Sequence, residues 1–95
     1  MILARVSGSL VASHRCDEVE GARYLMVTST DSRGLAKGSA MIALDTVGAG
    51  QDEIVLVAQG SSARQTKLSD KKAIDAVIIG IVDQVDVDGA LTYRK

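Results

Sequence analysis

The sequence predicts an all-β protein, built as a small five-stranded antiparallel β-barrel. Apolar and polar residues alternate with period two along most of the chain, and glycine-rich or Asp-Gly turns separate the alternating segments. The chain has no Phe, Trp or Pro, so its core must be built from Val, Ile, Leu, Ala and Met. With 95 residues it has the length of one domain, and we expect residues 1–95 to form that domain.

The first strand is predicted at residues 2–12, where the even positions are apolar or glycine and the odd positions include Arg5 and Ser7. Further strands are predicted at residues 23–30 and 39–47, separated by the polar turn DSRG. A sheet with one buried face would produce this alternation.

The remaining strands differ, because residues 54–58 and 76–82 are apolar on both faces and need cover on each side. The second of them returns to alternation and continues to Val87, and Asp88-Gly89 then predicts a tight hairpin. A short helix is predicted between Ser61 and Ala76, with Ser61 or Ser69 as its N-cap. Five strands with a short helix before the last long strand suggest a barrel that resembles the oligonucleotide-binding (OB) fold in outline.

Strands 54–58 and 76–82 carry more apolar residues than the inside of such a barrel needs. An apolar surplus on an outer face is typical of a subunit interface. A chain this short has little reserve stability and often adds disulfides, a metal or partner subunits. Cys16 is the only cysteine, so a disulfide within the chain is excluded.

Charge and hydropathy identify no nucleic-acid or membrane partner. The net charge is −1, with no block of like charge. The N-terminal MILARVSGSL lacks the pattern of a signal peptide, and the longest apolar run, residues 76–82, is far below the roughly 18 to 20 residues that span a bilayer. We therefore expect a protein of the reducing cytoplasm with no membrane contact.

Two glycine-containing turns are candidate sites. Gly48, Ala49 and Gly50 follow a strand, but Asp52 and Glu53 come next and a β-branched run follows, whereas a phosphate cradle requires a helix N-terminus there. A tight structural turn is the favoured interpretation. In GSSAR, residues 60–64, Gly60, Ser61, Ser62 and Arg64 have the chemistry to hold a small anion, although a segment that caps its own helix is favoured.

The sequence gives little support for a catalytic or a metal site. His14 and Cys16 are two ligands where a structural zinc site needs about four, and nothing orients them as a nucleophile and base. Asp75 and Asp83 fit strand-end capping or an intersubunit ion pair better than acid–base chemistry. Tyr24 and Tyr93 are too few aromatics for a single-strand groove. We expect no catalytic set, no metal and no cofactor.

Three stretches carry a family resemblance: MILARVSGSLVAS at the N-terminus, DTVGAGQDEIVLVAQGSSARQ at residues 45–65 and AVIIGIVDQVDV at residues 76–87. They resemble the EutN/CcmL family, the pentameric vertex proteins of bacterial microcompartment shells. The family pattern reads D-x-(V/I)-G-A-G-x-G-E-x-V-L, then G-S-S-A-R, then V-I-G-I-V-D. Asp52 departs from it, standing where the family commonly has glycine.

The resemblance implies a non-enzymatic shell protein with an OB-like barrel. It implies a cyclic homopentamer at the five-fold vertices of a shell otherwise made of hexameric shell proteins. The predicted structural or interface residues are Gly48, Ala49, Gly50, Gly60, Ser61, Ser62, Arg64 and Asp83. A single-stranded nucleic-acid-binding module of the same barrel type, or a small enzyme that uses Cys16 or the carboxylates, are the alternatives.

Overall fold

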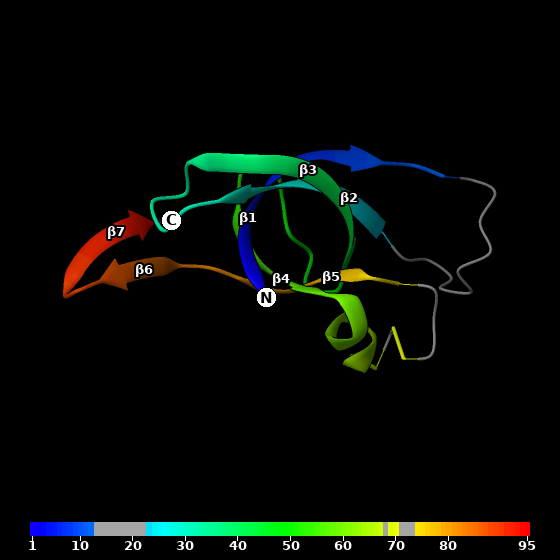
Figure 1. The fold of residues 1–95 in the computed structure, drawn as a ribbon. Coiled ribbons are helices and arrows are strands. Elements are labelled where there is room, and N and C mark those ends of the chain that lie inside the picture. The colour runs from blue at the N-terminus through cyan, green and yellow to red at the C-terminus, as the bar shows by residue number, and fades with distance from the viewer. Residues whose placement is uncertain (13–22, 68, 71–73) are drawn as a thin grey trace.

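The computed structural model describes residues 1–12, 23–67, 69–70 and 74–95 of the chain. Figure 1 shows a barrel from which a hairpin projects on one side. In chain order the elements are β1 (Ile2–Leu10), β2 (Arg23–Thr30), β3 (Ala36–Asp45), β4 (Ile54–Gln59), the 3-10 helix η1 (Gly60–Gln65), β5 (Ala76–Ile81), β6 (Gln84–Val87) and β7 (Ala90–Arg94).

Five strands close into a barrel in the order β1-β2-β3-β5-β4, which confirms the predicted barrel. Neighbouring strands run antiparallel except for β3 and β5, which pair in parallel through Leu44 with Val77 and Asp45 with Ile78. The parallel pair corrects the expectation of a wholly antiparallel barrel. A closed ring with an odd number of strands cannot alternate direction all the way round, so one neighbouring pair must run parallel.

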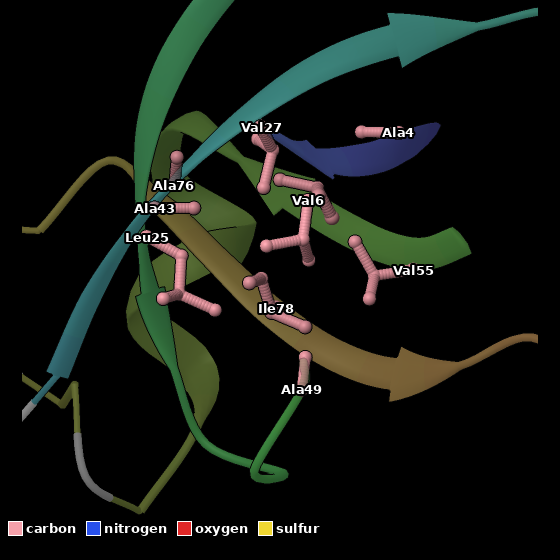
Figure 2. Close-up of a cluster of buried hydrophobic side chains, with 10 residues drawn as sticks. Ala4, Val6, Leu25, Val27, Ala43, Ala49, Val55, Ala76 and Ile78 are labelled. Atoms are coloured by element: carbon pink, nitrogen blue, oxygen red, sulfur yellow. The ribbon is translucent and has the colours of Figure 1, made fainter. Parts of the chain in front are cut away.

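The barrel is filled by small and β-branched side chains rather than by aromatic rings. Figure 2 shows side chains from all five barrel strands converging, with Ala49 entering from the loop after β3. Cross-strand partners such as Val6 and Val27 share the inner face, as the period-two alternation predicts. The cluster consists of Ala4, Val6, Leu25, Val27, Ala43, Ala49, Val55, Val57, Ala76 and Ile78.

A second apolar cluster lies outside the barrel wall, under η1. Leu44, Ala63, Ile74 and Val77 form it, and Tyr24 packs against it. Some outer residues of the two strands that are apolar on both faces are therefore covered within the chain, whereas Ile79 stays exposed. Val77 is fully buried, and Ala58 and Ile54 are almost so. The apolar surplus of residues 54–58 and 76–82 is thus only partly left for a subunit interface, because η1 and Tyr24 occupy part of that face.

The helical segment is one short 3-10 helix without a side-chain cap. Its N-cap residue is Gln59, so Ser61 does not cap it. Ser69, the other candidate cap, is fully buried and donates its hydroxyl to the Ala63 carbonyl at 2.5 Å. Residues 71–73, which follow Ser69 closely, lie outside the described residues.

The predicted long strand at residues 76–87 is divided in two. β5 ends at Ile81, where the Val82 N–H still donates to the Ile54 carbonyl at 2.8 Å, and β6 then pairs with β7 in a separate two-stranded sheet. The turn of this hairpin has positive φ at Asp88 (52°) and Gly89 (81°), as a two-residue type I′ turn requires. The hairpin predicted from Asp-Gly is therefore confirmed.

Candidate functional site

The first candidate turn, residues 46–53, is organised by the carboxylate of Asp45. Its oxygens accept backbone N–H groups from Val47 and Gly48 at 3.1 Å and from Ala49 at 3.2 Å. Asp45 is almost fully buried, so these N–H groups are satisfied by an acceptor that water cannot easily replace. An Asp that accepts N–H groups two to four residues ahead is a local turn device, and here it fixes the path of the chain across the barrel end.

Arg23, the first residue of β2, completes this arrangement. Its Nη2 lies 3.3 Å from Oδ2 of Asp45 and donates to the Ala49 carbonyl at 2.8 Å. The Arg23 side chain is 60% exposed, so its charge is largely screened by solvent. Its contribution is mainly geometric, because one guanidinium nitrogen joins the Asp45 carboxylate to the Ala49 carbonyl in the first half of the turn.

Ala49 is the point at which this turn enters the core. It is 1% exposed, and in Figure 2 its methyl group points at the interior beside Ile78. Gly48 has φ of 73°, in the left-handed region that favours glycine. Gly50 differs, since its φ is not positive and a Cβ there would meet Oε1 of Glu53 at 3.3 Å.

Glu53 holds the other end of the turn. Its Oε1 accepts the Gly50 N–H at 2.5 Å, and its Oε2 lies 2.7 Å from Nζ of Lys95. The Lys95 ammonium, followed by the Gly50 N–H, lowers the pKa of Glu53, and the same carboxylate raises the pKa of Lys95. This contact between Glu53 and Lys95, called the terminal clamp below, ties the end of β7 to the start of β4.

Asp52 adopts φ of 67°, so the residue that replaces the family glycine occupies a position where glycine is favoured. The Glu53 N–H donates to the Gly50 carbonyl at 3.2 Å, and Asp52 is the third residue of that turn, as in a type II turn. The Asp52 N–H also donates to the Val6 carbonyl at 2.9 Å, which ties the turn to β1.

These contacts bear on the phosphate-cradle alternative. A cradle needs backbone N–H groups that are free to bind an anion. The N–H groups of residues 47–49 donate to Asp45, and that of Gly50 donates to Glu53. The turn thus already contains two carboxylates in the places where a phosphate would bind.

The second candidate turn, GSSAR, also bonds to its own chain. Gly60 has φ of 62°, and its N–H donates to the Asp75 carbonyl at 2.8 Å. The Ser62 hydroxyl donates to the Gln59 carbonyl at 2.7 Å, and Nη1 of Arg64 donates to the Ile74 carbonyl at 3.2 Å. Ser61 is exposed. Among the described residues, no hydrogen bond or ion pair joins this turn to the first one.

Asp83 lies exposed in the short break between β5 and β6. Its carbonyl accepts the N–H of Lys95 at 2.8 Å, and its charge contributes to the raised pKa of that lysine. It therefore sits beside the terminal clamp. Asp45, Arg23, Glu53 and Lys95 are the organising residues that sequence reasoning missed, although Asp45 with a glycine three residues later is a recognisable turn signal.

The part of the chain that the structure describes contains no group of three or more His, Cys, Asp and Glu side chains placed to hold a metal ion. His14 and Cys16 lie outside that part. Nor do the described residues include a helix long and apolar enough to cross a membrane. The hydrogen bonds of Asp45, Glu53, Ser62 and Arg64 go to backbone groups of their own chain. Fold and site together therefore define a small barrel scaffold.

This scaffold has a known family. Residues 1–83 match the family described as "Ethanolamine utilisation protein EutN/carboxysome". The chain belongs to this family, as the three sequence stretches predict.

The relatives are shell proteins. The carboxysome shell vertex protein CcmL of Gloeobacter violaceus is 41% identical over the whole chain and 95% of its own length. The shell vertex protein GrpN of Rhodospirillum rubrum is 41% identical over 90% of the chain and 97% of its length, and the shell vertex protein EutN of Salmonella typhimurium is 39% identical over the whole chain and 96% of its length.

Solved structures agree with the sequence relatives. The structure of Gloeobacter violaceus CcmL superposes with a TM-score of 0.93 at 41% identity, covering the whole chain and 98% of its own. The structure described as the GrpN pentameric microcompartment shell protein from Rhodospirillum rubrum gives 0.81 at 39% identity, covering 92% of this chain and all of that one.

Proposed function

We propose that this chain is a structural vertex protein of a bacterial microcompartment shell, assembling as a cyclic homopentamer that caps the five-fold vertices. The observation that supports the proposal most directly is the match, over nearly the whole chain, to relatives named as shell vertex proteins, one of which is described as pentameric. Its other partners are the hexameric shell proteins that form the faces, and its place is the shell of a compartment inside the bacterial cytoplasm.

The geometric role follows from how a closed polyhedron is built. Six-fold tiles extend as flat sheets, and closure requires five-fold positions at which the sheet curves. A ring forms when one surface of a subunit binds a different surface of the next and the rotation closes on itself. Few copies suffice, because each shell has few vertices.

The distribution of exposed apolar residues fits such a head-to-tail contact. Met26 and Ile42 are cross-strand partners on the outer face of the barrel, and both are exposed. Val87 and Leu91 are exposed on the projecting hairpin. These two parts, among other exposed apolar positions, provide two different surfaces, which is what a heterologous ring requires.

A scaffold role without catalysis agrees with the chemistry of the turns. Asp45, Glu53 and Arg64 donate to or accept from the backbone of their own chain. The alternative of a single-stranded nucleic-acid module is not favoured, because the relatives are shell proteins and the two aromatic rings take part in packing. Tyr24 packs against the cluster under η1, and Tyr93 lies against Gly34.

The experiment that tests the proposal combines mass in solution with shell closure. Native mass spectrometry should give a particle of about five times the 9.9 kDa chain. Hexameric shell proteins co-expressed with this chain should then form closed polyhedra in electron micrographs, and the same proteins without it should form open or elongated structures. A monomer in solution, or closed and sealed shells in its absence, would overturn the proposal.

A further inference from the structure

A hollow of about 320 Å³, called the barrel-end hollow below, lies between the start of β1, the end of β2 and the start of β3. β2 and β3 pair Arg23 with Asp45 at one end and Thr30 with Ala36 at the other, so the hollow lies away from the first candidate turn. Its size falls at the lower end of the range of small-molecule sites, roughly 300–1,000 Å³. It is lined by Met1, Ile2, Leu3, Ser29, Thr30, Asp31, Ser32 and Lys37.

Thr30 brings an unpaired hydroxyl to this hollow. Its side chain lines the hollow although the residue is only 4% exposed, and its Oγ1 has no hydrogen-bond partner in the described part of the chain. Buried polar groups are nearly always hydrogen-bonded, because leaving such a bond unmade costs free energy. A lone buried hydroxyl beside a hollow therefore indicates a partner from outside the chain.

Two serines place further hydroxyls around the same hollow. A Cβ at Gly38 would lie 2.6 Å from Oγ of Ser29, so the glycine leaves the space that this hydroxyl occupies. Ser32 is held from the other side, because the Thr92 hydroxyl donates to its carbonyl at 2.6 Å. Within the described residues, neither serine hydroxyl has a hydrogen-bond partner. A hydroxyl both donates and accepts, so these groups can bind a polar ligand of either kind.

The barrel-end hollow is also lined by one charge of each sign. Oδ1 of Asp31 accepts the N–H groups of Arg33 at 2.8 Å and Leu35 at 3.1 Å, which fixes the carboxylate in place. These N–H groups, followed by the charges of Arg33 and Lys37, lower the pKa of Asp31 and keep it ionised at neutral pH. Lys37 is exposed, and in the described chain no ion pair joins it to Asp31 or to another carboxylate. The two charges thus line one hollow without neutralising each other.

This arrangement selects the charge of a ligand. A simple anion would be repelled by Asp31 and a simple cation by Lys37, whereas a molecule that carries both charges can pair with both residues. The apolar side of the hollow, formed by Ile2 and Leu3, suits a short alkyl group.

We propose that the barrel-end hollow binds a small zwitterion of the amino-acid class. The ammonium group of the ligand pairs with Asp31, and its carboxylate binds the Lys37 ammonium and the neighbouring hydroxyls, including that of Thr30. Its alkyl group lies against Ile2 and Leu3. The site goes beyond the proposed vertex role and does not depend on it, because all of these residues belong to one chain.

Amide chemical shifts of the ¹⁵N-labelled full chain, titrated with L-valine, test the site. Valine should cause saturable shifts at residues 29–32 and 37. Isovalerate lacks the ammonium group and isobutylamine lacks the carboxylate, and each should bind about tenfold more weakly, as expected for one lost charge-assisted hydrogen bond. Equal binding of all three probes would mean an adventitious additive only, and that result or the absence of saturable shifts in this region would overturn the inference. Native mass spectra of the same sample test the ring separately, so either proposal can fail without the other.

Three variants separate the roles of the lining residues. Lys37→Gln should weaken valine binding about tenfold and leave isobutylamine binding unchanged, because only the carboxylate partner is lost. Lys67→Gln, at an exposed lysine outside the hollow, is the matched control and should change neither. Thr30→Val removes the unpaired hydroxyl, so it should weaken valine binding while the ligand-free protein unfolds at the same or a higher temperature. A Thr30→Val or Lys37→Gln protein that binds valine as well as the wild type would contradict the proposal.

Discussion

Two turns of this protein are each organised by one aspartate carboxylate, and the two aspartates differ in how deeply they are buried. Asp31 and Asp45 both accept N–H groups from the residues that follow them. Asp31 is only partly buried, and two backbone N–H groups lower its pKa. Asp45 is almost fully buried, so loss of its carboxylate would leave N–H groups that water cannot readily reach.

We therefore expect Asp45→Ala to reduce the free energy of unfolding by about 2–3 kcal/mol, since several buried donors lose their acceptor. Asp45→Asn keeps one acceptor oxygen and should lose less. Asp31→Ala serves as the matched control and should have a clearly smaller effect. Urea unfolding at a fixed protein concentration measures all three variants, and equal losses at Asp45 and Asp31 would show that burial is not the deciding factor.

Asp52 adopts a backbone conformation that is unfavourable for a residue with a side chain. With φ of 67° it occupies a conformation that glycine adopts without strain, so we expect Asp52→Gly to stabilise the protein by about 0.5–1 kcal/mol. Gln51→Gly is the control, because Gln51 has no positive φ and glycine there should destabilise by adding unfolded-state entropy. Thermal unfolding would contradict the argument if both variants shifted the midpoint in the same direction.

At the scale of elements, the terminal clamp links β7 to β4 through one ion pair between an exposed lysine and a partly buried glutamate. Glu53 has a folded pKa below its ordinary value of 4.5, so its stabilising contribution is complete above pH 4.5 and is lost as the pH falls through the folded pKa. Lys95 has a folded pKa above its ordinary 10.5, so its contribution is complete below pH 10.5 and is lost as the pH rises through the folded pKa.

The difference in unfolding midpoint between the wild type and Glu53→Gln should accordingly be constant from about pH 5.5 to 9.5 and shrink outside that window. This difference should also fall with added salt, because both side chains are in contact with solvent. Lys95→Met removes the other partner of the ion pair. Its unfolding midpoint should lie below that of the wild type by most of the same amount. A gap between wild type and Glu53→Gln that persists unchanged at pH 3 would mean that the glutamate acts through packing rather than charge.

The strands were predictable from sequence because their signal is local. Alternation located β1 to β3, because side chains of a strand face opposite sides by geometry alone. Short continuous apolar runs located β4 and β5, and Asp-Gly located the turn between β6 and β7. The parallel pairing of β3 with β5 joins distant residues and has no local signal, although the odd strand number implies it. The break at Val82 and Asp83 was missed because Val85 and Val87 continue a strand-like alternation beyond it.

The turns were predicted less completely than the strands. The glycines marked both turns, and the positive φ of Gly48 and Gly60 could be anticipated from residue type. Lys95 as the partner of Glu53 could not be anticipated, because 42 positions separate them and only the folded barrel brings them together. Coverage of the outer faces of β4 and β5 by η1 was missed for the same reason.

At the scale of the whole molecule, Arg64 is the residue of the GSSAR turn most able to reach a neighbour. It is exposed and uses Nη1 for the Ile74 carbonyl, while a guanidinium carries five donors. We expect Arg64→Ala to weaken the pentamer, seen as a higher concentration for half-dissociation, with little change in far-ultraviolet circular dichroism. Arg64→Lys should restore part of the effect. If the pentamer of Arg64→Ala is as stable as that of the wild type, Arg64 makes no contact between subunits and only its hydrogen bond within the chain remains.

The last prediction concerns the dependence of folding on assembly. A core of Val, Ile, Leu and Ala in 95 residues provides little reserve, so we expect subunits to unfold as the ring dissociates. For a pentamer that dissociates on unfolding, mass action then lowers stability by about 1.1 kcal/mol per subunit for each tenfold dilution, four fifths of the usual 1.4 kcal/mol. In a domain of this size that corresponds to a fall of about 4–8 °C in the unfolding midpoint.

Differential scanning calorimetry across a hundredfold range of protein concentration measures this dependence directly. The comparison is Arg64→Ala, whose weakened ring should lower the midpoint below that of the wild type at every concentration. If the wild type is pentameric by mass but its midpoint does not move with concentration, the ring separates before the barrels unfold. Each barrel would then be stable on its own, and the two exposed apolar regions would serve assembly alone, without supporting the fold.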